Sequence, residues 1–167
     1  MIIVAKKMAE LASALQPHEN RDAFGRSAFN RCYYATYLIV REMLAGFNPG
    51  WKKTPHKKIP DILEEAILNR IKNELKKQER KGTLKVGRAS NIRKSAMFLV
   101  SELGALLKIA YSVRCVADYE PEKAVLFETG NVLKLEGHSV SEATKWADRA
   151  SEHTKNLIKL WRDLGLG

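Results

Sequence analysis

Three polar residues lie at the end of one apolar helical segment, and one of them, Arg114, could hold a phosphate group. Arg114, Asp118 and Tyr119 close a segment, residues 91–118, whose apolar positions repeat at alternating spacings of four and three. The planar guanidinium of Arg114 can bind a phosphate. An arginine and a carboxylate four residues apart on a helix can instead form a salt bridge that joins two helices. The sequence leaves both interpretations open.

A stripe of hydrogen-bonding side chains is predicted on a second helix, over residues 20–45. Ser27, Asn30, Arg31 and Tyr34 are spaced at i, i+3, i+4 and i+7, so they share one side of a helix that is otherwise largely apolar. We expect these four groups to face a shared cleft. A plausible fold sets Arg31 and Tyr34 against the end of the first segment, in a cluster that must be paired if it is buried.

The positive charge of the chain is concentrated in one quarter of its length. Residues 51–94 hold 14 Lys and Arg against 5 Asp and Glu, whereas the rest of the chain holds 15 against 14. A solvated helix face normally mixes both signs, so this surplus indicates an anionic partner, although a merely soluble basic face is the alternative. The residues predicted to bind nucleic-acid phosphates are Lys52, Lys53, Lys57, Lys58, Lys72, Lys76, Lys77, Arg80, Lys81, Lys85 and Arg88.

Other common catalytic and metal-binding patterns are absent from the sequence. It contains no Gly-rich phosphate loop, no CxxC pair and no HExxH motif. The four histidines, at positions 18, 56, 138 and 153, have no metal-ligand spacing. Cys32 and Cys115 lie inside apolar helical patterns, which is typical of reduced, buried thiols. We therefore predict neither a metal site nor a cofactor.

The fold that must position these groups is predicted to be all-α, an up-and-down bundle of about five helices. The expected helices cover about residues 2–15, 20–45, 59–81 and 91–118, and a last helix that starts at a capping box. Ser139 and Glu142 form that capping box, and Gly165 is expected to end the last helix. Gly46 is expected to end the second helix, and residues 46–58 and 82–90 are expected to be loops.

The segment at 121–138 leaves two alternatives open. After Pro121, the sequence VLFETGNVLKLEG is compatible with an irregular loop or with a small hairpin that turns at Thr129-Gly130-Asn131.

The length and hydropathy of the chain predict one cytoplasmic domain over residues 1–167. The 45% apolar content is enough to form a core. No run of about 18 uncharged apolar residues occurs, and the N-terminal apolar stretch is too short for a signal peptide or a membrane span.

Two segments together resemble the HEPN family of small helical domains. The segment RSAFNRCYYATYLIVREML at 26–44 is similar to the second HEPN helix, with its Arg, spacer, Tyr-Tyr-Ala signature. The segment RCVADYEP at 114–121 is similar to an Arg-x-x-Ala-Asp-Tyr element of a HEPN branch often encoded beside minimal nucleotidyltransferases. His56 lies where that branch often has a histidine. The resemblance implies a helical domain that usually dimerises and, in many relatives, cuts RNA without metal between two subunits.

The sequence departs from the active members of that family at one point. Those members use an Arg followed, after four to six residues, by a His, but Asp118 and Tyr119 stand where this histidine would follow Arg114. Metal-free RNA cleavage needs one group to accept the 2′-hydroxyl proton and another to protonate the leaving oxygen. A tyrosine hydroxyl does this poorly at neutral pH.

The favoured hypothesis is therefore a non-catalytic, RNA-associated binding module of a toxin–antitoxin or defence system. It would form a homodimer, pair with a nucleotidyltransferase or antitoxin protein, and contact RNA through residues 51–94. The alternative is a metal-independent ribonuclease with a divergent active site, in which His56 acts beside Arg31 or Arg114 in the dimer. A third hypothesis is a structural adaptor whose basic segment contacts an acidic protein.

Overall fold

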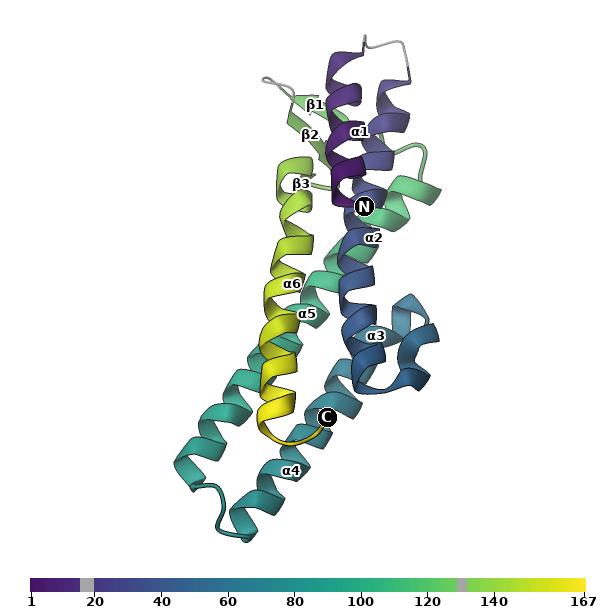
Figure 1. Ribbon diagram of the computed structural model, residues 1–167. Helices are drawn as coiled ribbons and strands as arrows, with labels where there is room; N and C mark the ends of the chain where they lie inside the picture. The colour runs from purple at the N-terminus through teal and green to yellow at the C-terminus, as the bar shows by residue number, and fades with distance from the viewer. Residues whose placement is uncertain (16–19, 129–131) are drawn as a thin grey trace. The chain divides into compact units, whose positions relative to one another are not determined.

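The computed structural model describes residues 1–15, 20–128 and 132–167. The helical elements are α1 (Ile2–Ala14), α2 (Arg21–Phe47), η1 (Pro49–Lys53), η2 (His56–Lys58), α3 (Ile59–Asp61), η3 (Ile62–Ile67), α4 (Leu68–Arg80), α5 (Val86–Tyr119) and α6 (Val140–Asp163). The strands are β1 (Leu126–Glu128), β2 (Val132–Leu135) and β3 (His138–Ser139) (Figure 1). The described residues thus form a helical bundle with one small sheet, which confirms the predicted all-α class.

The predicted helix over 59–81 is one continuous helical stretch with an irregular centre. The segments α3, η3 and α4 follow one another without a break from Ile59 to Arg80, and η3 is a π-helical segment. Ile71 and Leu75 are fully buried, as the apolar spacing predicted. The end of α6 is also as predicted: Gly165 has φ 67°, and the N–H groups of Gly165 and Leu166 bond to the carbonyls of Arg162 and Trp161.

Two predicted helix boundaries were wrong. The helix α5 begins at Val86 rather than near residue 91, because one glycine costs only about 1 kcal/mol in a helix and Ala89 in its first turns is fully buried. The helix α2 continues through Gly46 to Phe47. The ring of Phe47 stacks on Trp161 with 4.3 Å between centroids, which favours one further helical residue.

The segment after α5 is a small antiparallel sheet, so the hairpin alternative is correct. Phe127 pairs with Leu133 and Leu135 pairs with His138, in the order β1-β2-β3. Glu136 and Gly137 both have positive φ, as a two-residue hairpin turn requires. The predicted turn at 129–131 lies outside the described residues.

The chain divides into two compact units, and α2, α5 and α6 contribute residues to both. Unit 1 comprises Met1–Ile39 and Leu106–Ala150, and its core includes Phe29, Tyr33 and Trp146. Unit 2 comprises Val40–Ala105 and Ser151–Gly167, and its core includes Leu44, Leu103 and Trp161. Burial of each such side chain contributes about 1.5–3 kcal/mol.

Among the described residues, one helix, α5, is long and apolar enough to cross a membrane by length and composition alone. Half of its most apolar window is buried inside the structure, as in the core helix of a bundle. Its exposed side nevertheless carries large apolar side chains, among them Met97, Phe98 and Ile109.

Candidate functional site

The structure brings together three of the sequence-predicted site residues on the last turns of α5. Arg114 Nε lies 2.7 Å from Asp118 Oδ2, and the Arg114 guanidinium carbon lies 4.9 Å from the centre of the Tyr119 ring. The side chain of Arg114 is 14% exposed. The Nε–H group of Arg114 forms an ion pair with Asp118, but the angle does not suit a hydrogen bond. Among the described residues this buried donor is therefore only partly satisfied.

Asp118 connects this cluster to α2. Its Oδ1 accepts a 2.7 Å hydrogen bond from Asn30 Nδ2, while Oδ2 faces Arg114. The predicted polar stripe of α2 therefore reaches the end of α5 through Asn30. Arg31, which the sequence placed in the cluster, is exposed, and Ser27 is exposed as well.

All five tyrosines of the chain lie on the α2 and α5 segments of unit 1. The ring of Tyr33 lies 5.2 Å from Tyr34, 6.0 Å from Tyr37 and 5.9 Å from Tyr111, measured between centroids. Tyr119, by contrast, is 67% exposed. Four aromatic rings thus pack together beside Arg114; Tyr33 and Tyr37 are buried, Tyr34 and Tyr111 are half-buried, and Tyr119 is exposed.

The electrostatics of this cluster favour a permanently charged arginine. Burial alone would lower the pKa of Arg114, but the Tyr119 phenol and the Asp118 carboxylate outweigh it, so the pKa is raised above its ordinary value. Burial, with a smaller contribution from Tyr37, raises the pKa of Tyr33. The contact with Cys115 raises the pKa of Tyr111. Tyr33 and Tyr111 therefore stay protonated at neutral pH and cannot act as bases.

His56 does not belong to the same unit as these residues. It is half-buried in η2 of unit 2, whereas Arg114, Asp118, Tyr119 and Tyr34 all belong to unit 1. His56 and Arg114 therefore do not belong to the same unit.

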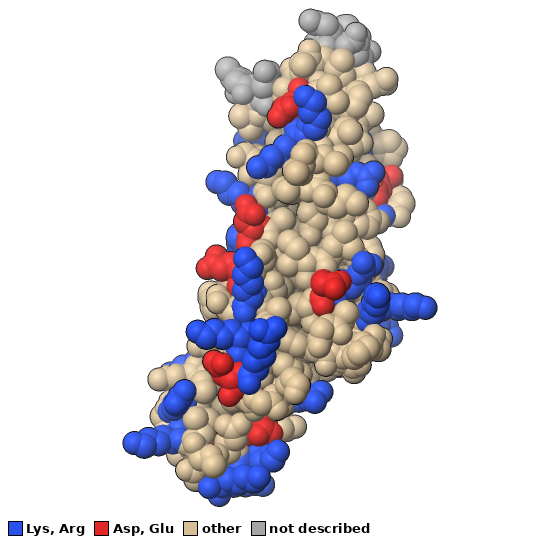
Figure 2. Space-filling model, viewed as in Figure 1, with Lys and Arg blue, Asp and Glu red and all other residues tan. Residues whose placement is uncertain are grey.

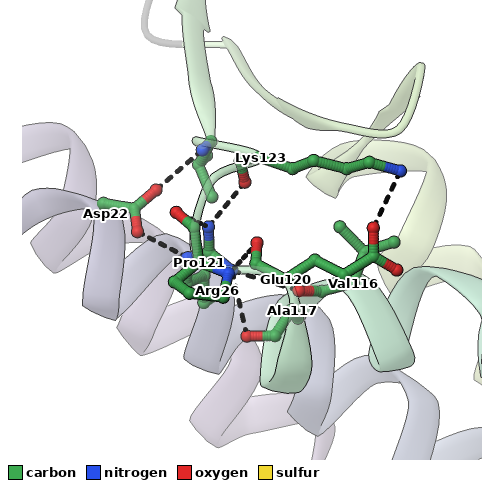
Figure 3. A network of polar contacts seen from close by, with 8 residues as sticks. Asp22, Arg26, Val116, Ala117, Glu120, Pro121 and Lys123 are labelled. Atoms are coloured by element: carbon green, nitrogen blue, oxygen red, sulfur yellow. Dashed lines mark hydrogen bonds and ion pairs between the residues drawn. The ribbon is translucent and has the colours of Figure 1, made fainter.

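Arg26, which the sequence interpretation did not single out, binds the carboxyl end of α5 (Figure 3). Its guanidinium donates to the backbone carbonyls of Val116, Ala117, Glu120, Pro121 and Lys123. The last carbonyls of a helix have no partners within it and carry partial negative charge, so a buried cation stabilises them. No basic residue of α5 itself lies in its last turn.

Asp22 holds Arg26 in this position. One carboxylate oxygen accepts from Arg26 Nε, and the other accepts a 2.7 Å hydrogen bond from the Val125 amide. The i, i+4 spacing of Asp22 and Arg26 was the signal available in the sequence. The pair fixes the turn that follows Asp118 and Tyr119.

The second candidate site is the basic surface of unit 2, which we define by the eleven lysines and arginines predicted above to contact phosphates. All eleven lie in unit 2; ten are exposed and Lys72 is half-buried. Unit 2 as a whole has 18 Lys and Arg against 9 Asp and Glu, whereas unit 1 has 11 against 10. The two units therefore carry +9 and +1 of the net charge of +10.

The carboxylates of α4 neutralise little of this surface. Glu74 pairs with Lys77 and Gln78, and Glu79 lies 3.8 Å from Arg93. Within the described part of the chain, Lys72, Lys76 and Arg80 form no ion pair, and their i, i+4, i+8 spacing places them about 6 Å apart along one line. In Figure 2, the lower part of the view, which holds α4 and the first turns of α5, shows more blue than red atoms.

The described residues contain no group of three or more potential metal ligands among His, Cys, Asp and Glu. Both cysteines are free; Cys32 is buried and Cys115 is half-buried rather than fully buried as predicted.

The chain was compared with protein-family models, curated proteins and solved structures. No family model matches the chain, and no significant match was found among curated proteins or solved structures. The HEPN resemblance therefore rests on the two sequence segments alone.

Proposed function

We propose that this protein is an RNA-associated binding module that contacts its RNA through the basic surface of unit 2. The observation that carries the proposal is the segregation of charge, because unit 2 holds nine of the ten surplus positive charges in side chains that are almost all exposed. Phosphate contacts by Lys and Arg supply most of the affinity for a nucleic-acid backbone.

The cluster around Arg114 supports a structural role over a catalytic one. Asp118 is bonded to both Arg114 and Asn30, and tyrosine phenols surround the guanidinium. A metal-independent ribonuclease would need a proton acceptor near neutral pKa beside this arginine. The binding module is therefore proposed as the function, with the divergent ribonuclease as its alternative.

The HEPN resemblance supports two further parts of the proposal: a homodimer, and a nucleotidyltransferase or antitoxin partner in a toxin–antitoxin or defence system. The hydropathy of the chain supports the cytoplasmic location that we also propose. The homodimer is also supported by large apolar side chains that are exposed on α5, those of Met97, Phe98 and Ile109. A neighbouring copy would remove their apolar surface from water.

The test is to incubate the purified protein with mixed cellular RNA, with and without a chelator, and to measure binding and cleavage separately. The proposal expects binding in both conditions and no cleavage. Chelator-resistant cleavage that is lost in Arg114→Ala would establish the ribonuclease instead. Absence of binding at low salt would contradict both and favour the adaptor.

A further inference from the structure

A small cavity in unit 2 lies between the end of α4, the start of α5 and the end of α6. Its volume is about 260 Å³, below the size typical of drug-sized ligand sites, so it suits one small group such as a single nucleobase. Leu84, Ile92 and Leu160 form an apolar lining, and Arg88, Lys159 and Asp163 contribute charged groups.

The charged groups of this cavity are available to a ligand. Among the described residues, Arg88, Lys159 and Asp163 are exposed and make no ion pair or hydrogen bond through their side chains. Arg88 belongs to the basic surface, and Lys81 and Lys85 of that surface are its near neighbours in sequence. A strand held there by its phosphates would pass the mouth of the cavity.

The chemistry of the lining matches an unpaired base of that strand. Apolar side chains pack against the faces of an unstacked base. A carboxylate accepts hydrogen bonds only, and guanine is the base whose edge presents two neighbouring N–H donors, at N1 and at the exocyclic amino group. Asp163 can therefore accept from both donors at once, in a charge-assisted pair.

We infer that this cavity binds one unpaired guanine base of a single-stranded RNA. The inference rests on the proposed function and adds base selectivity to it. Arg88 and Lys159 would contact the flanking phosphates, Asp163 the guanine edge, and the three aliphatic side chains its ring.

The test compares two RNA octamers that carry the same number of phosphates. One is all-uridine, and the other has one guanosine at its centre. Because the charge is equal, their dissociation constants at one salt concentration differ only by the base. A base held by stacking or by a bidentate pair gains about fivefold or more in affinity, so we expect the guanosine octamer to bind at least about fivefold tighter.

Two variants assign this gain to the cavity. Asp163→Asn removes the charge and replaces one of the two acceptor oxygens by an NH2 donor, so the pair with two guanine N–H groups cannot form. Ser95→Phe fills the cavity from an exposed position in its lining. Asp148→Asn, at an exposed position of α6 in unit 1, is the control with the same change of charge. We expect the first two variants to bind both octamers equally and the control to keep the preference, with circular dichroism showing that all three are folded.

The outcomes separate the two proposals. Equal binding of both octamers by the wild type overturns the base-binding inference and leaves the proposed function standing. A guanosine preference that survives in both variants also overturns it, because another site then selects the base. Binding of neither octamer contradicts the proposed function and the inference together.

Discussion

Asn30 on α2 donates a 2.7 Å hydrogen bond to Asp118 on α5, and the other oxygen of that carboxylate faces Arg114. One carboxylate therefore joins two helices and neutralises the partly buried guanidinium. The pair with Asp118 therefore compensates an arginine side chain that is only 14% exposed.

Asp118→Ala is expected to lower the free energy of unfolding by about 1–3 kcal/mol, because it leaves Arg114 without its ion-pair partner and Asn30 without its hydrogen-bond acceptor. Urea unfolding measures this change. Glu10→Ala, which breaks the exposed pair with Lys7, is the control and should change stability by less than about 0.5 kcal/mol. Equal effects of the two substitutions would show that Asp118 does not stabilise the cluster.

Arg26→Lys is expected to lower the free energy of unfolding by at least about 2 kcal/mol, since an ammonium cannot reach the five carbonyls that the guanidinium fork binds. Arg31→Lys on the exposed side of the same helix is the matched control and should be neutral. If the two variants unfold at the same urea concentration, Arg26 is not the cap of α5.

How far the sequence predicted the site depends on which interactions were local. The pair of Arg114 and Asp118 is one helical turn apart, so its spacing was visible. On α2, Asn30 contacts Asp118, whereas Arg31 is exposed. Which of these neighbouring residues faces α5 depends on the rotation of α2 about its axis, and the spacing of the four polar residues does not specify that rotation. Arg26 binds carbonyls about 90 residues away, and backbone acceptors leave no residue type to recognise.

In the fold, too, the sequence predicted local features better than features that depend on tertiary contacts. Helix periodicity predicted the buried faces, including Ile71 and Leu75. The start of α5 depended on the burial of Ala89, a tertiary contact that outweighs the cost of Gly87 within the helix. The surplus of nine positive charges in residues 51–94 was visible in the sequence, and unit 2 has the same surplus because its other residues add four Lys and Arg and four Asp and Glu.

Stability should fall as the pH rises above 9, because burial raises the pKa of Cys32 from its ordinary 9.0 to about 12. A thiol whose folded pKa is raised contributes fully below the unfolded pKa, and its contribution is lost between pH 9 and pH 12. The expected slope between pH 9 and 10 is up to about 1.4 kcal/mol per pH unit. Urea unfolding at these pH values should show a flatter dependence in Cys32→Ala. An unchanged slope in this variant would assign the effect to another group.

Phe98→Glu is expected to convert a dimer into a monomer, because it places a charge in the exposed apolar side of α5. Light scattering after gel filtration measures the mass. Val86→Glu, at an exposed apolar position in the first turn of α5, is the control and should remain dimeric. A wild-type chain that is monomeric at every concentration would contradict the proposed homodimer.

The central claim, that RNA binds the basic surface of unit 2, is tested most directly by the salt dependence of binding in two charge-reversed variants. The first carries Glu at Lys72, Lys76, Arg80 and Lys81 in unit 2; the control carries Glu at Lys6, Lys7, Lys108 and Lys145, four exposed positions in unit 1. Both variants change the net charge equally. The slope of log affinity against log salt is about 0.7 per neutralised phosphate on a single strand. We expect the unit 2 variant to lose affinity and to have a shallower slope, while the control keeps the wild-type slope. Equal slopes in the two variants would contradict the claim and show that only net charge, and not this surface, determines binding.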